Sequence, residues 1–146
     1  MAIRQVTPDE AQKLLLDEGY RYLDVRTEGE FAAGHPATAV NIPVASPNRV
    51  TGQMAMNSDF LAVVEAHLPK HTKIVVGCQS GGRSQRAAEL LTQAGYSQVV
   101  NMEGGFGGVR DQTGRTVVAG WAERGLPICT ECGAENSYAG LREKLQ

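Results

Sequence analysis

The sequence shows its fold most clearly in the stretch Lys73-Ile74-Val75-Val76-Gly77-Cys78-Gln79-Ser80-Gly81-Gly82-Arg83-Ser84. The apolar run before Gly77 predicts a short buried strand. Residues 77–83 are glycine-rich and predict a loop, and 84–94 predict a helix that ends at Gly95. A strand, a loop and a helix in this order form the repeating unit of parallel sheets. Because ligands of such sheets bind at the carboxyl ends of the strands, the loop that contains Cys78 is the first candidate site.

The segments on both sides of this stretch continue the alternation of helix and strand. Thr7 and Thr27 are each followed three residues later by glutamate, a capping-box pattern that marks the start of a helix. Residues 44–57 are expected to form a long surface loop. Further helices are expected at 8–18, after Thr27 and at 59–68, and further strands at 20–25, 40–42 and 99–100. We therefore predict an α/β domain with a mostly parallel central sheet flanked by helices.

The composition favours one domain that acts on small molecules or proteins. A chain of 146 residues with 42% hydrophobic content can bury one core. Its net charge of -2, from 14 basic and 16 acidic residues, and its 5% aromatic content argue against nucleic-acid binding. No run approaches the roughly 20 apolar residues of a membrane helix, and the first residues lack a secretory pattern. We expect a cytoplasmic protein without membrane contact, and an odd number of cysteines fits such a reducing compartment.

Cys78 lies where a predicted strand ends and a predicted helix begins, so that several backbone N–H groups can converge on it. Gly81 and Gly82 let the backbone turn inward, and Arg83 adds a positive charge. Such a cradle favours the nucleophilic thiolate, and it can hold a persulfide or a substrate anion without a neighbouring base. The alternative is a buried, inert thiol in a tight turn. The position between strand and helix favours the functional interpretation.

The spacing from Cys78 to Arg83, Cys-x-x-Gly-x-Arg, resembles the active-site loop of single-domain members of the rhodanese family. Two further segments resemble signatures of that family, in the family's order. The amino-terminal signature is matched by Leu23-Asp24-Val25-Arg26-Thr27, Glu30-Phe31, Gly34-His35 and Asn41-Ile42-Pro43. The carboxy-terminal signature is matched by Glu103-Gly104-Gly105, Trp121 and Gly125-Leu126-Pro127-Ile128. The resemblance covers most of residues 3–128 and implies a rhodanese-like fold.

The resemblance also implies a sulfurtransferase that takes sulfur from thiosulfate or a similar small donor. The Cys78 thiolate would attack the outer sulfur, release sulfite and rest as a persulfide, and a thiophilic acceptor would then remove the sulfur. Cyanide is the usual acceptor in the laboratory, whereas glutathione, another small thiol or thioredoxin would serve in a cell. Neither a metal nor an organic cofactor is implied. Arg83 would orient the anionic donor, and the residues implied to hold donor or sulfur are Gln79, Ser80, Gly81, Gly82, Arg83 and Ser84.

Asp24, Arg26 and His35 are expected to support the site rather than to react. By the family resemblance, Asp24 and Arg26 form a structural ion pair that anchors a loop, in keeping with the rule that buried charges are usually paired. A catalytic role is the less favoured interpretation of both. His35 is expected to be a hydrogen-bonded scaffold residue, with a general base as the alternative.

The chain departs from the family pattern between Gly105 and Trp121, where an insertion of about 107–120 is implied. Its centre, 110–118, has a glycine turn between strand-forming residues and predicts a small hairpin. This hairpin either shapes the mouth of the site or is a surface excursion. We place the rhodanese domain, with its insertion, at 1–128 and a tail at 129–146.

The tail carries the second departure, the pair Cys129 and Cys132. Cys-x-x-Cys is typical of redox pairs and of half metal sites, but a zinc ion wants four ligands and no second pair or adjacent histidine is present. We therefore assign no metal. The hypothesis for this pair is a redox couple or a relay that accepts sulfur from Cys78, and the alternative is two incidental thiols. Residues 137–145 predict a short helix that packs on the domain.

Three other functions compete with this assignment. Cysteine phosphatases and arsenate reductases resemble Cys-x5-Arg, whereas Cys78 and Arg83 enclose four residues, a shorter loop that suits a single sulfur atom. A non-catalytic persulfide carrier or regulatory module would use the same fold without turnover. A mercaptopyruvate-specific enzyme is ranked below thiosulfate, because such family members usually have smaller, uncharged loop residues and two domains.

Overall fold

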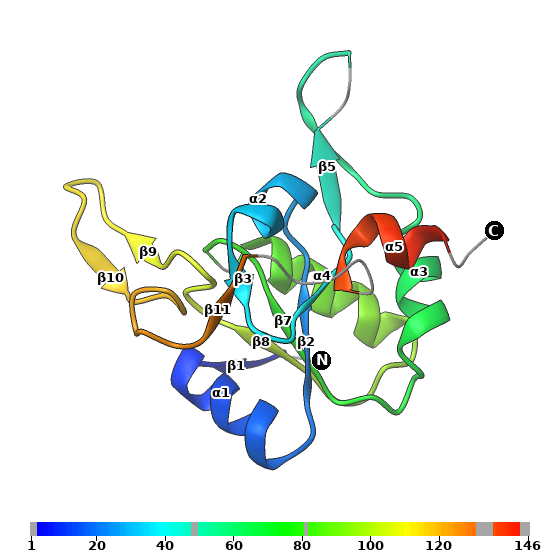
Figure 1. The fold of residues 1–146 in the computed structure, drawn as a ribbon, viewed down its shortest axis with the longest axis horizontal. Coiled ribbons are helices and arrows are strands. Elements are labelled where there is room, and N and C mark those ends of the chain that lie inside the picture. The colour runs from blue at the N-terminus through cyan, green and yellow to red at the C-terminus, as the bar shows by residue number, and fades with distance from the viewer. Residues whose placement is uncertain (1–2, 48–49, 81, 131–135, 144–146) are drawn as a thin grey trace.

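Helices and strands alternate along the chain in the computed structural model, which describes residues 3–47, 50–80, 82–130 and 136–143 (Figure 1). In chain order the elements are β1 (Arg4–Val6), α1 (Pro8–Asp17), β2 (Arg21–Asp24), α2 (Glu28–Ala33), β3 (His35–Pro36), β4 (Val40–Asn41), β5 (Ala45–Pro47), β6 (Met54–Met56), α3 (Phe60–His67), β7 (Ile74–Gly77), α4 (Gly82–Gln93), β8 (Val99–Met102), β9 (Val109–Arg110), β10 (Thr116–Val118), β11 (Ile128–Cys129) and α5 (Tyr138–Glu143). Within these ranges no helix is long and apolar enough to cross a membrane.

A five-stranded sheet with the order β1-β8-β7-β2-β4 lies at the centre, and all of its neighbouring strands are parallel. This arrangement confirms the predicted α/β class with a parallel sheet. The register pairs Asp24 with Gly77, so β2 and β7 end side by side. The loops that follow these two strands therefore leave the same edge of the sheet, and one of them carries Cys78. The edge strand β1, which pairs with β8, was not predicted from the sequence because only Val6 of its three residues is buried.

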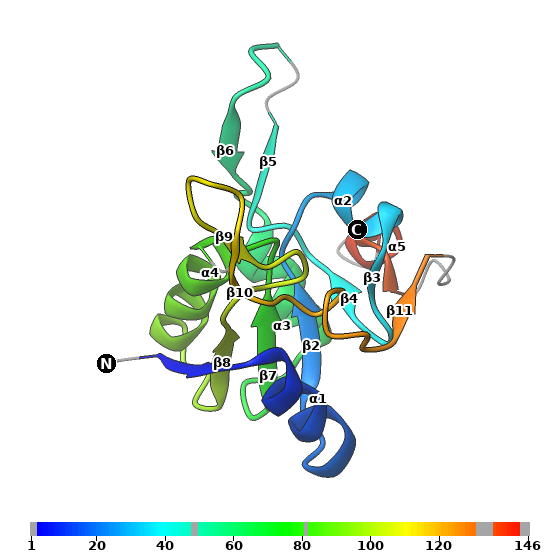
Figure 2. The ribbon, with the colours of Figure 1, turned by 90° about the vertical axis from the view of Figure 1, so that its left-hand side faces the viewer.

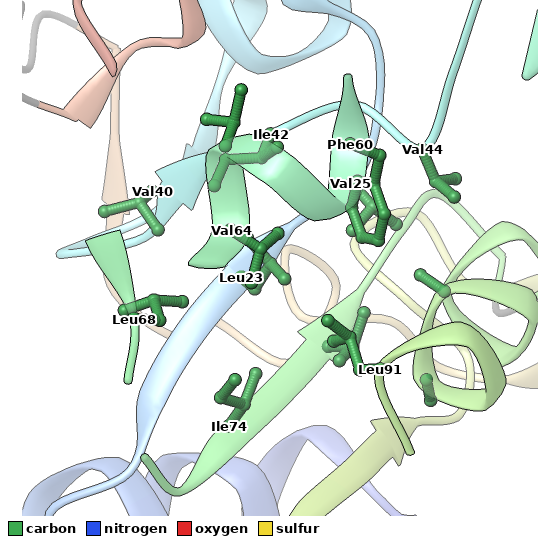
Figure 3. Packing of buried hydrophobic residues seen from close by; sticks show 14 of the residues in the cluster. Leu23, Val25, Val40, Ile42, Val44, Phe60, Val64, Leu68, Ile74 and Leu91 are labelled. Atoms are coloured by element: carbon green, nitrogen blue, oxygen red, sulfur yellow. The ribbon is translucent and has the colours of Figure 1, made fainter. Parts of the chain in front are cut away.

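The two faces of the sheet bury separate sets of apolar side chains, because successive residues of a strand point to opposite faces. Leu23, Ile74 and Val76 belong to a core cluster with side chains of α3, α4 and α5 (Figure 3). Tyr22, Val75 and Val100 belong to a second cluster with side chains of α1 and Trp121. The sheet is thus a buried middle layer, as expected for parallel strands.

The starts of α1 and α2 are fixed by their predicted capping boxes. At α1 the Thr7 side chain accepts a hydrogen bond from the Glu10 N–H at 3.2 Å, and the Glu10 carboxylate accepts one from the Thr7 N–H at 3.0 Å. Thr27 and Glu30 repeat the arrangement at α2, with distances of 3.3 and 3.1 Å. This cap fixes the backbone position from which the Glu30 side chain projects.

Two hairpins project from the sheet edge that carries the loops (Figure 2). The first joins β5 and β6 in antiparallel fashion, so the segment 44–57, expected to be a long surface loop, contains two paired strands. Its strands bury almost nothing, because β6 is exposed throughout, and they therefore lack the apolar alternation by which strands are recognised in a sequence. The second pairs β9 with β10 and confirms the hairpin predicted within the insertion.

The carboxy-terminal part of the chain returns to the body at two places. Strand β11 pairs antiparallel with β3, which places Cys129 opposite His35. Helix α5 lies within the predicted range 137–145 and buries Tyr138 and Leu141 in the cluster beneath α3. The ring of His67, at the end of α3, makes a hydrogen bond to the Leu141 carbonyl at 2.8 Å.

Candidate active site

Cys78 directly follows the central strand β7, and its side chain is only 1% exposed. It carries a thiol rather than a disulfide and packs in the cluster that includes Val76 and Leu91. The loop after it leads within a few residues into α4, which begins at Gly82, two residues before the predicted start. By helix geometry the first N–H groups of α4 have no acceptor within the helix. Of the remaining loop residues, Gln79, Ser80 and Gly82 are exposed, Arg83 is partly exposed, Ser84 is buried, and Gly81 lies outside the described residues.

The segment after β8 holds the cysteine loop through backbone contacts. The Phe106 N–H donates to the Cys78 carbonyl at 2.7 Å, and the Gly107 N–H donates to the Gln79 carbonyl at 2.9 Å. Gly105, with φ of +60°, lies so close that a Cβ there would be 2.4 Å from the Cys78 carbonyl oxygen. The Gly-Gly motif of the carboxy-terminal signature thus packs directly against the nucleophile loop.

Arg26 connects the end of β2 with the same loop. Its guanidinium binds the Asp24 carboxylate at 2.8–3.1 Å, and both side chains are almost completely buried. The same group donates to the Gly34 carbonyl at 2.7 Å and reaches the Gln79 side-chain oxygen at 3.4 Å. It also lies over the Phe106 ring, 4.4 Å from the centroid. Asp24 and Arg26 therefore form a buried ion pair, which matches their expected supporting role in geometry.

Arg83 is engaged by Glu30 rather than open to a donor anion. Its two terminal nitrogens donate to the two Glu30 oxygens at 2.7 and 2.9 Å, a bidentate pair between α4 and α2. These hydrogen bonds lower the pKa of Glu30 to about 2, against the opposing effect of burial. They also raise the pKa of Arg83, to which the nearby charge of Cys78 adds a smaller contribution. Both cations that flank the cysteine loop, Arg26 and Arg83, are thus neutralised by carboxylates.

His35 and Ser84 make internal hydrogen bonds. The His35 ring is 2% exposed, stacks on Phe31 with centroids 3.6 Å apart, and makes a hydrogen bond to the Phe31 carbonyl at 2.7 Å. The Ser84 hydroxyl donates to the Asn101 side chain on β8 at 2.5 Å, so its hydroxyl is turned to the sheet. These contacts give His35 the geometry of a scaffold residue.

The tail cysteines are only partly described. Cys129 lies on β11, is partly buried and takes part in a disulfide bond, whereas a composition with three cysteines had favoured thiols in a reducing compartment. Cys132 lies outside the described residues. A redox or relay role of the pair stays a prediction.

Two residues near the loop were missed from the sequence. Glu30 was recognised as a helix cap but not as the partner of Arg83, which is 53 residues away. Phe106 precedes the expected insertion of about 107–120 and was given no role, yet its ring contacts Arg26 and its N–H holds Cys78. The signal for Glu30 was present in the family-like segment Glu30-Phe31, whereas no local pattern marks Phe106.

The fold and the site define an α/β domain in which a cysteine loop joins the central parallel strand to a helix at the ligand-binding edge of the sheet. The chain matches the Rhodanese-like domain family over residues 7–112 and belongs to that family. Thiosulfate sulfurtransferase 16, chloroplastic, of Arabidopsis thaliana is 42% identical over 113 residues, which cover 77% of this chain and 82% of the relative. Such relatives place the chain in the sulfurtransferase family.

Two further comparisons agree with this assignment. Rhodanese-like domain-containing protein 15, chloroplastic, of Arabidopsis thaliana is 37% identical over 121 residues; the match covers 83% of this chain but only 59% of that longer protein. The crystal structure of Rv0390 from M. tuberculosis superposes with a TM-score of 0.73 at 29% identity, covering 90% of this chain and all of that one. The predicted rhodanese-like fold is confirmed.

Proposed function

We propose that this protein is a thiosulfate sulfurtransferase that carries the sulfur as a persulfide on Cys78. The observation that carries the proposal is the position of the Cys78 thiol, at the end of β7 and before the amino terminus of α4. Such a position surrounds a sulfur anion with backbone N–H groups. The relative named thiosulfate sulfurtransferase supports the choice of donor.

The transfer takes two steps. The Cys78 thiolate attacks the outer sulfur of thiosulfate; the bond between the two sulfurs of thiosulfate breaks, its electron pair leaves with sulfite, and a Cys78 persulfide remains. A thiolate or cyanide acceptor then attacks the outer sulfur of the persulfide, and the electron pair of that bond returns to Cys78. Because sulfite leaves before the acceptor reacts with the covalent persulfide, the kinetics are ping-pong.

The engagement of Arg83 supports sulfur transfer over oxyanion hydrolysis. A phosphatase needs its loop arginine to bind two oxygens of the substrate, but both terminal nitrogens of Arg83 are bound to Glu30. The loop is also one residue shorter than Cys-x5-Arg. With the Arg83 fork occupied, donor binding falls mainly to the loop backbone from Gln79 to Ser84.

The test is thiosulfate treatment of the protein, followed by mass spectrometry and by an assay of sulfur transfer to cyanide. Wild type gains one sulfur and releases one sulfite, whereas Cys78→Ser gains none and loses transfer. Ser97→Ala is the control, because Ser97 lies in the exposed turn before β8, at the opposite end of that strand from the loops. Transfer by Cys78→Ser at the wild-type rate would contradict the proposal. A stable persulfide that is not turned over with any thiol would instead favour the carrier function. Hydrolysis of an aryl phosphate would favour the phosphatase function.

A further inference from the structure

An apolar pocket lies beside the cysteine loop, between α2, α4 and the β5–β6 hairpin. Its volume is about 480 Å³, and it is lined by Thr27, Glu30, Ala45, Met54 and Arg83. Small-molecule sites in proteins are commonly concave, mostly apolar and roughly 300–1,000 Å³ in volume. The pocket is therefore large enough for an organic molecule and much larger than thiosulfate requires.

Two walls of the pocket come from the elements that flank the cysteine loop. Arg83 belongs to the Cys78 loop itself, five residues after the nucleophile, and it senses the charge of Cys78, which adds to the rise in its pKa. Thr27 and Glu30 follow β2, whose end is paired with the end of β7. The remaining wall, Ala45 and Met54, comes from the hairpin that stands over this edge of the sheet (Figure 2).

The charges of the pocket are balanced, so its selectivity rests on apolar contact. Glu30 and Arg83 face each other in a bidentate pair and leave no net charge at the rim. The Met54 side chain is 50% exposed, and a flexible thioether of this kind adapts to the shape of an apolar ligand. A ligand that lies here gains most by covering Met54, Ala45 and the methyl group of Thr27.

We propose that this pocket binds the acceptor of the second half-reaction, and that the acceptor is a small organic thiol with an apolar substituent. The inference rests on the proposed function, whose persulfide supplies the sulfur. The substituent lies against Met54 and Ala45, and the thiolate attacks the outer sulfur of the Cys78 persulfide. The bond between the persulfide sulfurs breaks, Cys78 recovers its thiolate, and the acceptor leaves as an organic persulfide. No oxidant or reductant is consumed, because sulfane sulfur passes from one thiolate to another.

The hairpin offers a matched pair of variants. Met54 lines the pocket, whereas Met56, two residues further along β6 and 54% exposed, does not belong to its described lining. Met54→Gln and Met56→Gln each replace a thioether by a polar side chain of similar length. The two changes cost similar strand propensity and surface hydrophobicity, but only Met54→Gln alters the pocket.

The experiment measures kcat/KM for ethanethiol, propanethiol and butanethiol as acceptors with thiosulfate as donor. These thiols have similar intrinsic reactivity, so differences in kcat/KM among them report the binding of the alkyl chain. Wild type and Met56→Gln should gain about two- to fourfold in kcat/KM for each added methylene, and Met54→Gln should lose most of this gain. A rate that does not depend on chain length in wild type, or equal loss in both variants, overturns the proposal.

Two controls separate the failure of this inference from other outcomes. If thiosulfate releases sulfite and cyanide is turned over while the alkanethiols show no dependence on chain length, only the acceptor pocket is refuted. If no sulfite is released, the proposed function fails as well. If both methionine variants weaken transfer to reduced thioredoxin alike and the alkanethiols show no dependence, the hairpin is a protein-docking surface and the small-thiol pocket is overturned.

Discussion

Gly105 shows how the cysteine loop depends on close backbone approach at a single residue. Its Cα lies against the backbone of Cys78 and Gln79, where a Cβ would come within 2.4–2.7 Å of their atoms. Its φ of +60° is also unfavourable for any residue with a side chain. The Phe106 N–H that binds the Cys78 carbonyl follows directly after this glycine. The geometry of the nucleophile is thus set partly by a residue without a side chain.

We expect Gly105→Ala to lower the free energy of unfolding by about 2–4 kcal/mol, because it adds strain at positive φ and forces the cysteine loop to move. Sulfur transfer should fall more than stability alone explains, since Cys78 is displaced. Gly29→Ala is the control: this glycine lies in α2 with nothing within 4 Å of its Cβ position, and alanine there should raise stability by up to about 1 kcal/mol. Denaturant unfolding and the cyanide assay measure both effects. Equal stability of the two variants would refute the steric explanation.

At the scale of elements, the Glu30–Arg83 pair joins α2 to the start of α4. The capping box that starts α2 holds Glu30 at its third helical position, and α4 begins with the last residues of the cysteine loop. The pair is partly exposed, with side chains 33% and 28% accessible, so water screens part of its attraction. Its main effect is to hold the two helix starts in register around the loop.

The protein should lose stability as pH falls from about 4.5 to about 2. The hydrogen bonds from Arg83 hold the pKa of Glu30 at about 2 in the folded chain, below the ordinary value of 4.5. In this window the unfolded chain takes up a proton at Glu30 while the folded chain does not, so protons favour unfolding. Above about pH 4.5 the contribution of the Glu30–Arg83 pair to the free energy of unfolding is fully present.

Glu30→Gln should flatten this part of the profile of unfolding free energy against pH, because its amide does not titrate. Glu89→Gln, which removes an exposed carboxylate from the middle of α4, is the control and should keep the wild-type slope. Chemical denaturation between pH 2 and 5 measures the slope. If Glu30→Gln keeps the wild-type slope of unfolding free energy against pH, other carboxylates cause the loss of stability at low pH.

At the scale of the whole molecule, two carboxy-terminal elements, β11 and α5, pack against parts that are far apart in the sequence (Figure 1). Strand β11 pairs with β3, whose neighbour Gly34 supplies a carbonyl to Arg26. Through Arg26 this strand pair is connected to Gln79 in the cysteine loop. Helix α5 then packs in the core cluster with side chains of α3. The tail that follows the family match is therefore part of the fold and not an appendage.

The redox hypothesis for the tail predicts a selective effect of Cys129→Ser. If reduced thioredoxin first opens the Cys129 disulfide and the freed thiol then takes sulfur from Cys78, transfer to thioredoxin should fall severalfold in the variant. Transfer to glutathione, a small thiol that reaches Cys78 directly, should remain. Parallel assays with the two acceptors measure the ratio. The melting temperature of each variant separates relay from loss of the β11–β3 pair. Equal transfer to both acceptors in the variant would count against any role of this disulfide in catalysis.

Local patterns sufficed for most elements of the fold and for the nucleophile. The capping boxes at Thr7 and Thr27 and the hairpin around Gly114 could be recognised because their hydrogen bonds join residues only a few positions apart. The strand before Cys78 could be recognised from its continuous apolar run. The β5–β6 hairpin could not, since its exposed strands carry no apolar alternation. The start of α4 was placed two residues late, because the first turn of a helix needs no buried face.

The sequence by itself determined the α/β class, the place of Cys78 at the end of a central strand and the family that its loop resembles. Only the tertiary structure decided that Glu30 binds Arg83, that Gly105 and Phe106 hold the Cys78 backbone, and that Met54 and Arg83 line the same pocket. The physical reason is distance along the chain. A cap or a strand is specified by neighbouring residues, whereas the partners of Cys78 and Arg83 come from segments that meet only when the sheet has formed.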